Sequence, residues 1–131
     1  MEGESKRDIG INYYDLAKAV SMAHKKIAGA IIVRKGSLLA AAARPGMPMP
    51  EKSKLTELIL QAELIVNISK RNSDIFGEVE VLFVQHRMLS VMVVPLSPEV
   101  TLALAVEGKV ASDYEYADLT KEIFQLINDS K

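Results

Sequence analysis

The chain has 131 residues, of which 25% are charged, and a formal net charge of −1, a length and composition that suit one globular domain. It contains no cysteine, which excludes disulfides, thiolate metal ligands and thiol nucleophiles and favours an intracellular location. A net charge near zero is untypical of nucleic-acid-binding proteins, and no apolar run reaches the roughly 18 residues of a membrane span. We therefore expect a cytoplasmic protein with no membrane span and no nucleic-acid partner.

The N-terminal segment is polar and charged from Met1 to Asp8, and we interpret residues 1–11 as a disordered tail before a single domain at residues 12–128. The first predicted helix runs from about Tyr13 to Ile27, with Asn12 as its N-cap. Gly29 is expected to end it. Its apolar stripe consists of Leu16, Val20, Ala23 and Ile27.

Two strands are predicted next, at Ala28 to Arg34 and Leu38 to Ala43. The turn Lys35-Gly36 between them is short, so the two strands should be antiparallel. The first strand is apolar at consecutive positions, which indicates that both of its faces are covered.

A proline-rich loop at residues 44–50 leads into the longest predicted helix, at about Glu51 to Asn72. This helix carries more apolar surface than one face needs. We therefore expect it to contact a partner as well as its own sheet. Its wide stripe consists of Leu55, Leu58, Ile59, Ala62, Ile65 and Val66, and its second stripe of Leu60, Leu64 and Ile68.

Three further strands are predicted at Glu78 to Gln85, Leu89 to Val94 and Val100 to Val106. A last helix begins near Ser112, where Ser112 and Glu115 have capping-box spacing. The element order is α-β-β-α-β-β-β-α, and short turns within each group of strands indicate an antiparallel sheet. Because most strands are apolar on both faces, the sequence predicts an α+β fold with three layers, an α/β/α sandwich.

The sequence carries no recognisable catalytic signature. It has no phosphate-binding glycine loop and no nucleophile elbow. His24 and His86 lie far apart in the chain without a third candidate ligand at matching spacing. Glu78 and Glu80 share one face of a strand, which is more typical of a protected sheet edge than of acid/base catalysis. We predict no catalytic residue, no metal site and no cofactor, and hence no enzyme.

The pattern resembles the Roadblock/dynein light chain domain family. Three passages carry the resemblance: the helix-to-hairpin segment Ile27 to Ala40, the long apolar middle helix, and the three-strand block that ends at Leu102 to Val106. The resemblance implies a five-stranded antiparallel sheet in the order 2-1-5-4-3. It also implies that the first and last helices cover one face and the middle helix covers the other.

Members of that family form dimers through their third strands and middle helices, and act as dynein light chains or as scaffolds or regulators of small Ras-like GTPases. The resemblance therefore implies a homodimeric adaptor for such a GTPase, or a heterodimer with a related chain. A longin- or profilin-like trafficking or cytoskeletal module is the alternative. The implied dimer interface consists of Leu55, Leu58, Ile59, Ala62, Ile65, Val66, Val79, Val81 and Phe83.

Two further expectations concern ligands. The loop before the middle helix contains adaptable methionines, and the helix start carries lysines, so we expect a GTPase or other protein partner at Met47, Met49, Lys52 and Lys54. A small-molecule sensor would instead need a cavity, and the bulky residues of the strands give little sign of one.

Overall fold

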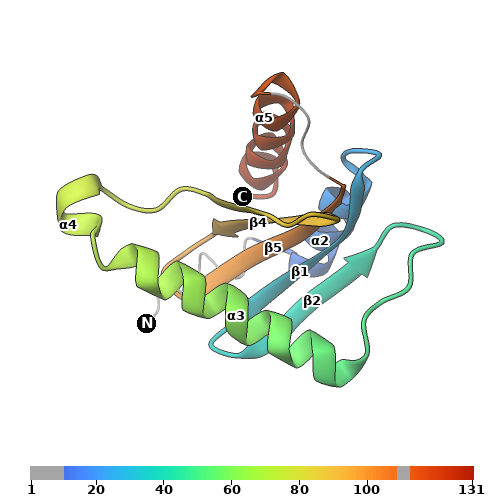
Figure 1. Cartoon of the computed structure of the whole chain (residues 1–131), viewed down its shortest axis with the longest axis horizontal. Coiled ribbons are helices and arrows are strands. Elements are labelled where there is room, and N and C mark those ends of the chain that lie inside the picture. Colours follow the sequence, from blue (N-terminus) through green and yellow to red (C-terminus); the bar gives the residue numbers. More distant parts are fainter. Residues whose placement is uncertain (1–10, 109–112) are drawn as a thin grey trace.

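The computed structural model describes residues 11–108 and 113–131, and for residues 113 and 114 it describes the backbone alone. The predicted element order is confirmed, with one short helix added after the long one (Figure 1). The helices are α2 (Tyr13–Met22), α3 (Lys52–Lys70), α4 (Ser73–Phe76) and α5 (Asp113–Asp129), and the strands are β1 (Ile27–Arg34), β2 (Ser37–Ala43), β3 (Leu82–Gln85), β4 (Leu89–Pro95) and β5 (Val100–Glu107).

The five strands form one antiparallel sheet in the order β2-β1-β5-β4-β3, as predicted. Helices α2 and α5 pack on one face of this sheet, and α3 crosses the other face (Figure 1). The three-layer sandwich is therefore confirmed.

The main core lies between the sheet and the pair α2 and α5. In β5, Leu102, Leu104 and Val106 point into this core, whereas Ala103 points to the α3 side. This alternation follows from the two-residue period of a strand. The helices contribute Leu16, Ala17 and Val20 from α2 and Leu119, Ile123 and Ile127 from α5.

The first helix is shorter than predicted. It ends at Met22. Its N-cap is Asn12, as expected, and the Asn12 side chain accepts a hydrogen bond from the Asp15 N–H at 3.0 Å. Gly29 does not end the helix but lies inside β1, so that prediction was wrong. This segment is a strand and not a helix end because β1 is hydrogen-bonded to a strand on each side, to β2 and to β5.

The segment after α3 also differs from the prediction. The long helix ends at Lys70 and is followed by α4, whose C-cap is Gly77 with a φ of 84°. Strand β3 begins only at Leu82. The predicted N-terminal tail lies almost entirely outside the described residues, as does Ser112 of the predicted capping box. Ile11, the last residue of that tail, packs against the main core.

Candidate interaction surface

Helix α3 has one buried and one exposed apolar stripe. Ile59, Ala62 and Val66 are buried, and the latter two pack against Val93 and Ala103 of the sheet. On the outside, Leu60, Leu64 and Ile68 are 56%, 59% and 54% exposed, and we call these three residues the outer stripe. A run of exposed leucine and isoleucine at a spacing of four is unusual on a solvated helix and typical of a protein-binding surface.

The structure therefore divides the predicted dimer residues of α3. Ile59, Ala62 and Val66 are buried within the single chain, and Ala62 and Val66 pack against its own sheet. Their place in a dimer interface stays a prediction. Leu55, Leu58 and Ile65 instead line a groove beside the helix.

The predicted interface residues around β3 also divide. Val81 and Phe83 pack against the core on the side of α2 and α5, and the Phe83 ring contacts Tyr116 of α5. Val79 is half-buried in the extended segment before the strand. Val81 and Phe83 thus serve their own domain. The place of all three residues in a dimer interface stays a prediction.

Strand β3 is an edge strand. Its residues pair with β4 from Leu82↔Val93 to Gln85↔Ser90, and within the described residues no strand pairs with its other side. An unpaired row of N–H and C=O groups is a ready template for a strand of another chain.

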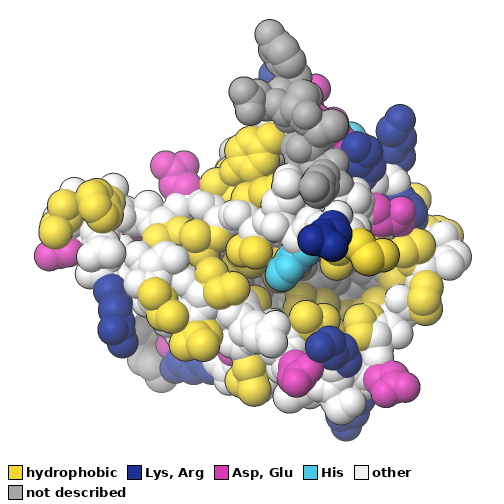
Figure 2. Space-filling model, viewed as in Figure 1, with side chains coloured by type: hydrophobic (Ala, Val, Ile, Leu, Met, Phe, Trp, Pro, Cys, Tyr) yellow, Lys and Arg dark blue, Asp and Glu magenta, His cyan; other side chains and the backbone are white. Residues whose placement is uncertain are grey.

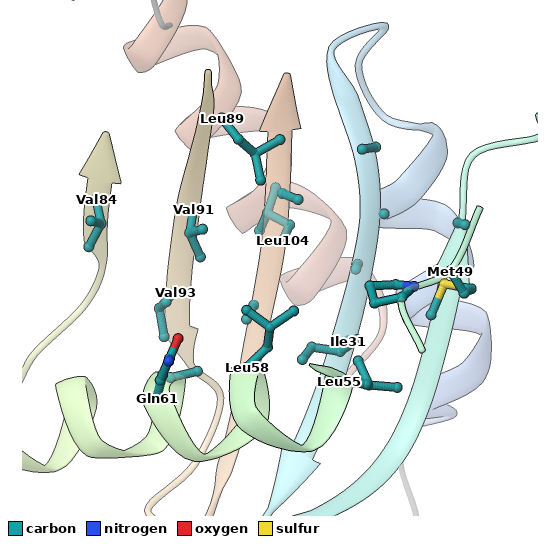
Figure 3. A pocket seen from close by; sticks show the side chains of 18 of the residues that line it. Ile31, Met49, Leu55, Leu58, Gln61, Val84, Leu89, Val91, Val93 and Leu104 are labelled. Atoms are coloured by element: carbon teal, nitrogen blue, oxygen red, sulfur yellow. The ribbon is translucent and has the colours of Figure 1, made fainter. Parts of the chain in front are cut away.

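A groove of about 330 Å³ lies between α3 and the sheet (Figure 3). In the sequence the bulky strand residues give little sign of a cavity, but small strand residues also border this groove: Gly29, Ala43, Ala103 and Ala105. The lining is almost wholly apolar, and among the described residues Gln61 and His86 are its only polar side chains.

The groove lies at one end of the strands. Helix α3 crosses the other end, where Lys70 Nζ donates a hydrogen bond of 3.1 Å to the Pro98 carbonyl in the β4–β5 turn. The groove is bordered instead by His86 and Leu89, where β3 connects to β4. Figure 3 shows Val84, Leu89 and Val91 pointing into the space above α3.

The four residues predicted to bind a partner differ in their surroundings. Met49 borders the groove, together with Pro48 and Pro50. Met47 is half-buried, and its N–H donates to the Arg44 carbonyl. Lys52 and Lys54 are exposed at the start of α3, where Lys54 Nζ contacts Glu57 Oε2 at 3.0 Å.

Helix α4 carries an exposed apolar pair that is not among the residues predicted from the sequence. Ile75 and Phe76 are 74% and 80% exposed. Figure 2 shows hydrophobic side chains over this end of the molecule, along α3, and in the hollow beside α3. The sequence signal for this short helix is Ile75-Phe76-Gly77, an apolar pair before a glycine. It is easily missed because the preceding helix is predicted to continue to Asn72.

The described residues contain no cluster of three or more histidine, aspartate and glutamate side chains that could hold a metal ion. None of their helices is long and apolar enough to cross a membrane.

Comparison with known proteins places the fold. No family model matches the sequence, and no curated protein matches it. Among solved structures, a Roadblock/LC7 domain from Streptomyces avermitilis is similar with a TM-score of 0.69 at 14% identity, over 87% of this chain and 90% of that one. The gliding protein MglB from Thermus thermophilus is similar with a TM-score of 0.61 at 14% identity, over 88% of this chain and 91% of that one.

A structure described as MglB with a tetrameric arrangement is similar with a TM-score of 0.58 at 12% identity, over 86% of this chain and 88% of that one. At such low identities the likeness concerns the fold. The sheet order and the placement of the helices agree with what the sequence resemblance implied. This chain has the Roadblock/LC7 fold.

Proposed function

We propose that this protein is a non-catalytic adaptor that forms a homodimer through α3 and β3 and binds a Ras-like small GTPase. The observation that carries the proposal is the outer stripe, in which three large apolar side chains of one helix face solvent together. Burying such side chains contributes roughly 1.5–3 kcal/mol each. A second copy that brings the same stripe supplies a matching surface.

The edge of β3 supports the same arrangement. Antiparallel pairing of two β3 strands would satisfy backbone groups that the single chain leaves open. It would also bring two copies together around a two-fold axis, which is the commonest symmetry of homo-oligomers. The tetrameric arrangement named for the MglB structure is a further precedent for self-association in this fold.

A GTPase partner is proposed from the family resemblance, and adaptor activity from the chemistry of the surface. The groove and the outer stripe expose carbon rather than carboxylates or nucleophiles. Such a surface suits protein contact more than bond breaking. A partner's nucleotide cycle would then change through contact with this surface.

The first test is oligomeric state. Sedimentation or light scattering at micromolar concentration should show a dimer, and a monomer at high concentration would contradict the proposal. The second is capture from a lysate loaded with a non-hydrolysable GTP analogue or with GDP, with the purified chain as bait and a Leu64→Glu variant as the matched control. Enrichment of a small GTPase by the unmodified chain supports the proposal, and its absence under both nucleotides argues against a GTPase partner.

A further inference from the structure

The groove beside α3 and the exposed pair on α4 are both apolar, yet they do not meet within one chain. Ile75 and Phe76 remain 74% and 80% exposed, and α4 follows the end of α3 that lies on the β3 side of the sheet (Figures 1 and 3). An open apolar groove and an exposed phenylalanine on the same molecule are each unfavourable in water. A second copy could cover both at once.

The sheet geometry brings the two features together. Suppose that two β3 strands pair antiparallel and that both α3 helices lie on the same face of the joined sheet. The two copies are then related by a two-fold axis that passes through the β3 edge, perpendicular to the sheet. That rotation moves the second copy's α3 to the end of the strands opposite this chain's α3. The groove occupies that opposite end, since it is bordered by His86 and Leu89 where β3 connects to β4.

We propose that Ile75 and Phe76 of a second copy occupy this groove, and that the contact is reciprocal. The inference rests on the proposed homodimer and adds to it a specific contact, because each groove is completed only by the other chain. Phe76 would enter beside Val84 and Leu89, which point into the open part of the groove.

The chemistry of the two surfaces is complementary. The groove offers an apolar lining of the size range in which proteins hold ligands. Buried aromatic side chains are frequent anchors at interfaces, because they bring a large apolar area at a small cost in conformational entropy. Gly77, with its φ of 84°, follows Phe76 directly as the C-cap of α4 and lets the chain turn away from the phenylalanine ring.

Disulfide trapping tests the contact in a chain that has no cysteine of its own. Two differently tagged variants are mixed, one with Phe76→Cys and the other with Leu89→Cys or Val84→Cys, and are oxidised mildly. We expect a link between the tagged chains in at least one pair, at a yield that rises with protein concentration. The matched control replaces the second variant with Met22→Cys, an exposed residue of α2 on the other face of the sheet, and should give at least tenfold less.

The trapping experiment, combined with sedimentation, distinguishes failure of this contact from failure of the homodimer itself. A dimer by sedimentation without a link from Phe76 to either groove position would overturn the inference and leave the dimer standing. A monomer by sedimentation would overturn both. A Phe76→Ser variant adds a second measure: we expect its dimer dissociation constant to rise about tenfold or more, whereas Met22→Ser should leave it unchanged.

An apolar fluorescent dye reports on other occupants of the groove. Its binding per chain should fall as the protein dimerises, and the Phe76→Ser dimer should keep it. If the unmodified dimer binds the dye as well as the monomer does, the groove stays open in the dimer. It would then be a site for a small apolar ligand or another protein, and the inference would be wrong.

Discussion

The rings of Phe83 and Tyr116 lie edge to face, with centroids 5.0 Å apart and planes at 90°. This contact joins the edge strand β3 to α5 on the face of the sheet opposite α3. It explains why Phe83, although it belongs to an edge strand, is directed into its own domain. The backbone of β3 is thereby held in place without using the side of the strand that a partner would need.

The first prediction concerns this ring pair. Replacing Tyr116 with alanine should lower the free energy of unfolding by about 2–4 kcal/mol, because the contact and the buried ring area are lost together. Tyr116→Phe keeps the ring and should cost less than about 1 kcal/mol. Urea unfolding followed by circular dichroism measures both. Equal losses in the two variants would show that the hydroxyl group, and not the ring contact, matters.

The second prediction concerns the close approach of β1 and β2. A Cβ atom added at Gly29 would lie 2.9 Å from the Ala42 carbonyl oxygen, so backbone atoms must shift to admit it. Gly29→Ala should therefore lower the free energy of unfolding by about 1–3 kcal/mol. Ser37→Ala, at an exposed position of β2, is the control and should stay within about 0.5 kcal/mol. A stabilised Gly29→Ala variant would show that the two strands can separate at no cost.

The third prediction separates the two stripes of α3. Leu64 is exposed and Val66 is buried, although they are two residues apart on one helix. Leu64→Glu should leave the fold intact and raise the dimer dissociation constant by at least about 100-fold, because a charge at a buried seam is strongly unfavourable. Val66→Glu should instead destabilise the fold by at least about 3 kcal/mol.

Circular dichroism and sedimentation of the two variants give the answer. A folded dimer of Leu64→Glu would remove the outer stripe from the interface. A folded Val66→Glu protein of unchanged stability would contradict the position of α3 on the sheet.

The sequence predicts the order of the elements well, because most strands show the two-residue period or full apolarity and the helices show their own stripes. It also shows that α3 has more apolar surface than one sheet requires. It does not show which stripe faces inward. The predicted interface takes in the wide stripe, whereas the structure buries Ile59, Ala62 and Val66 of that stripe within the single chain, since a domain must first cover its own core.

The groove was missed for a related reason. Its small residues, such as Gly29 and Ala103, are visible in the sequence, but each lies beside bulky neighbours that point to the opposite face. Whether small residues leave a cavity depends on how closely a helix covers them. Here α3 crosses one end of the strands and leaves the other end open, a placement that no local pattern encodes.

The last prediction is that the isolated protein binds no nucleotide tightly. A helix start that holds phosphate offers free backbone N–H groups and a positive or neutral first turn. At α2, the N-cap Asn12 already accepts from the Asp15 N–H, and Asp15 adds negative charge to the first turn. At α3, Pro50 has no N–H to donate and Glu51 is the N-cap residue. We therefore expect calorimetry with guanine and adenine nucleotides to give dissociation constants weaker than about 100 μM. Submicromolar binding would show that the chain holds a nucleotide itself, and it would replace the adaptor proposal with a nucleotide sensor.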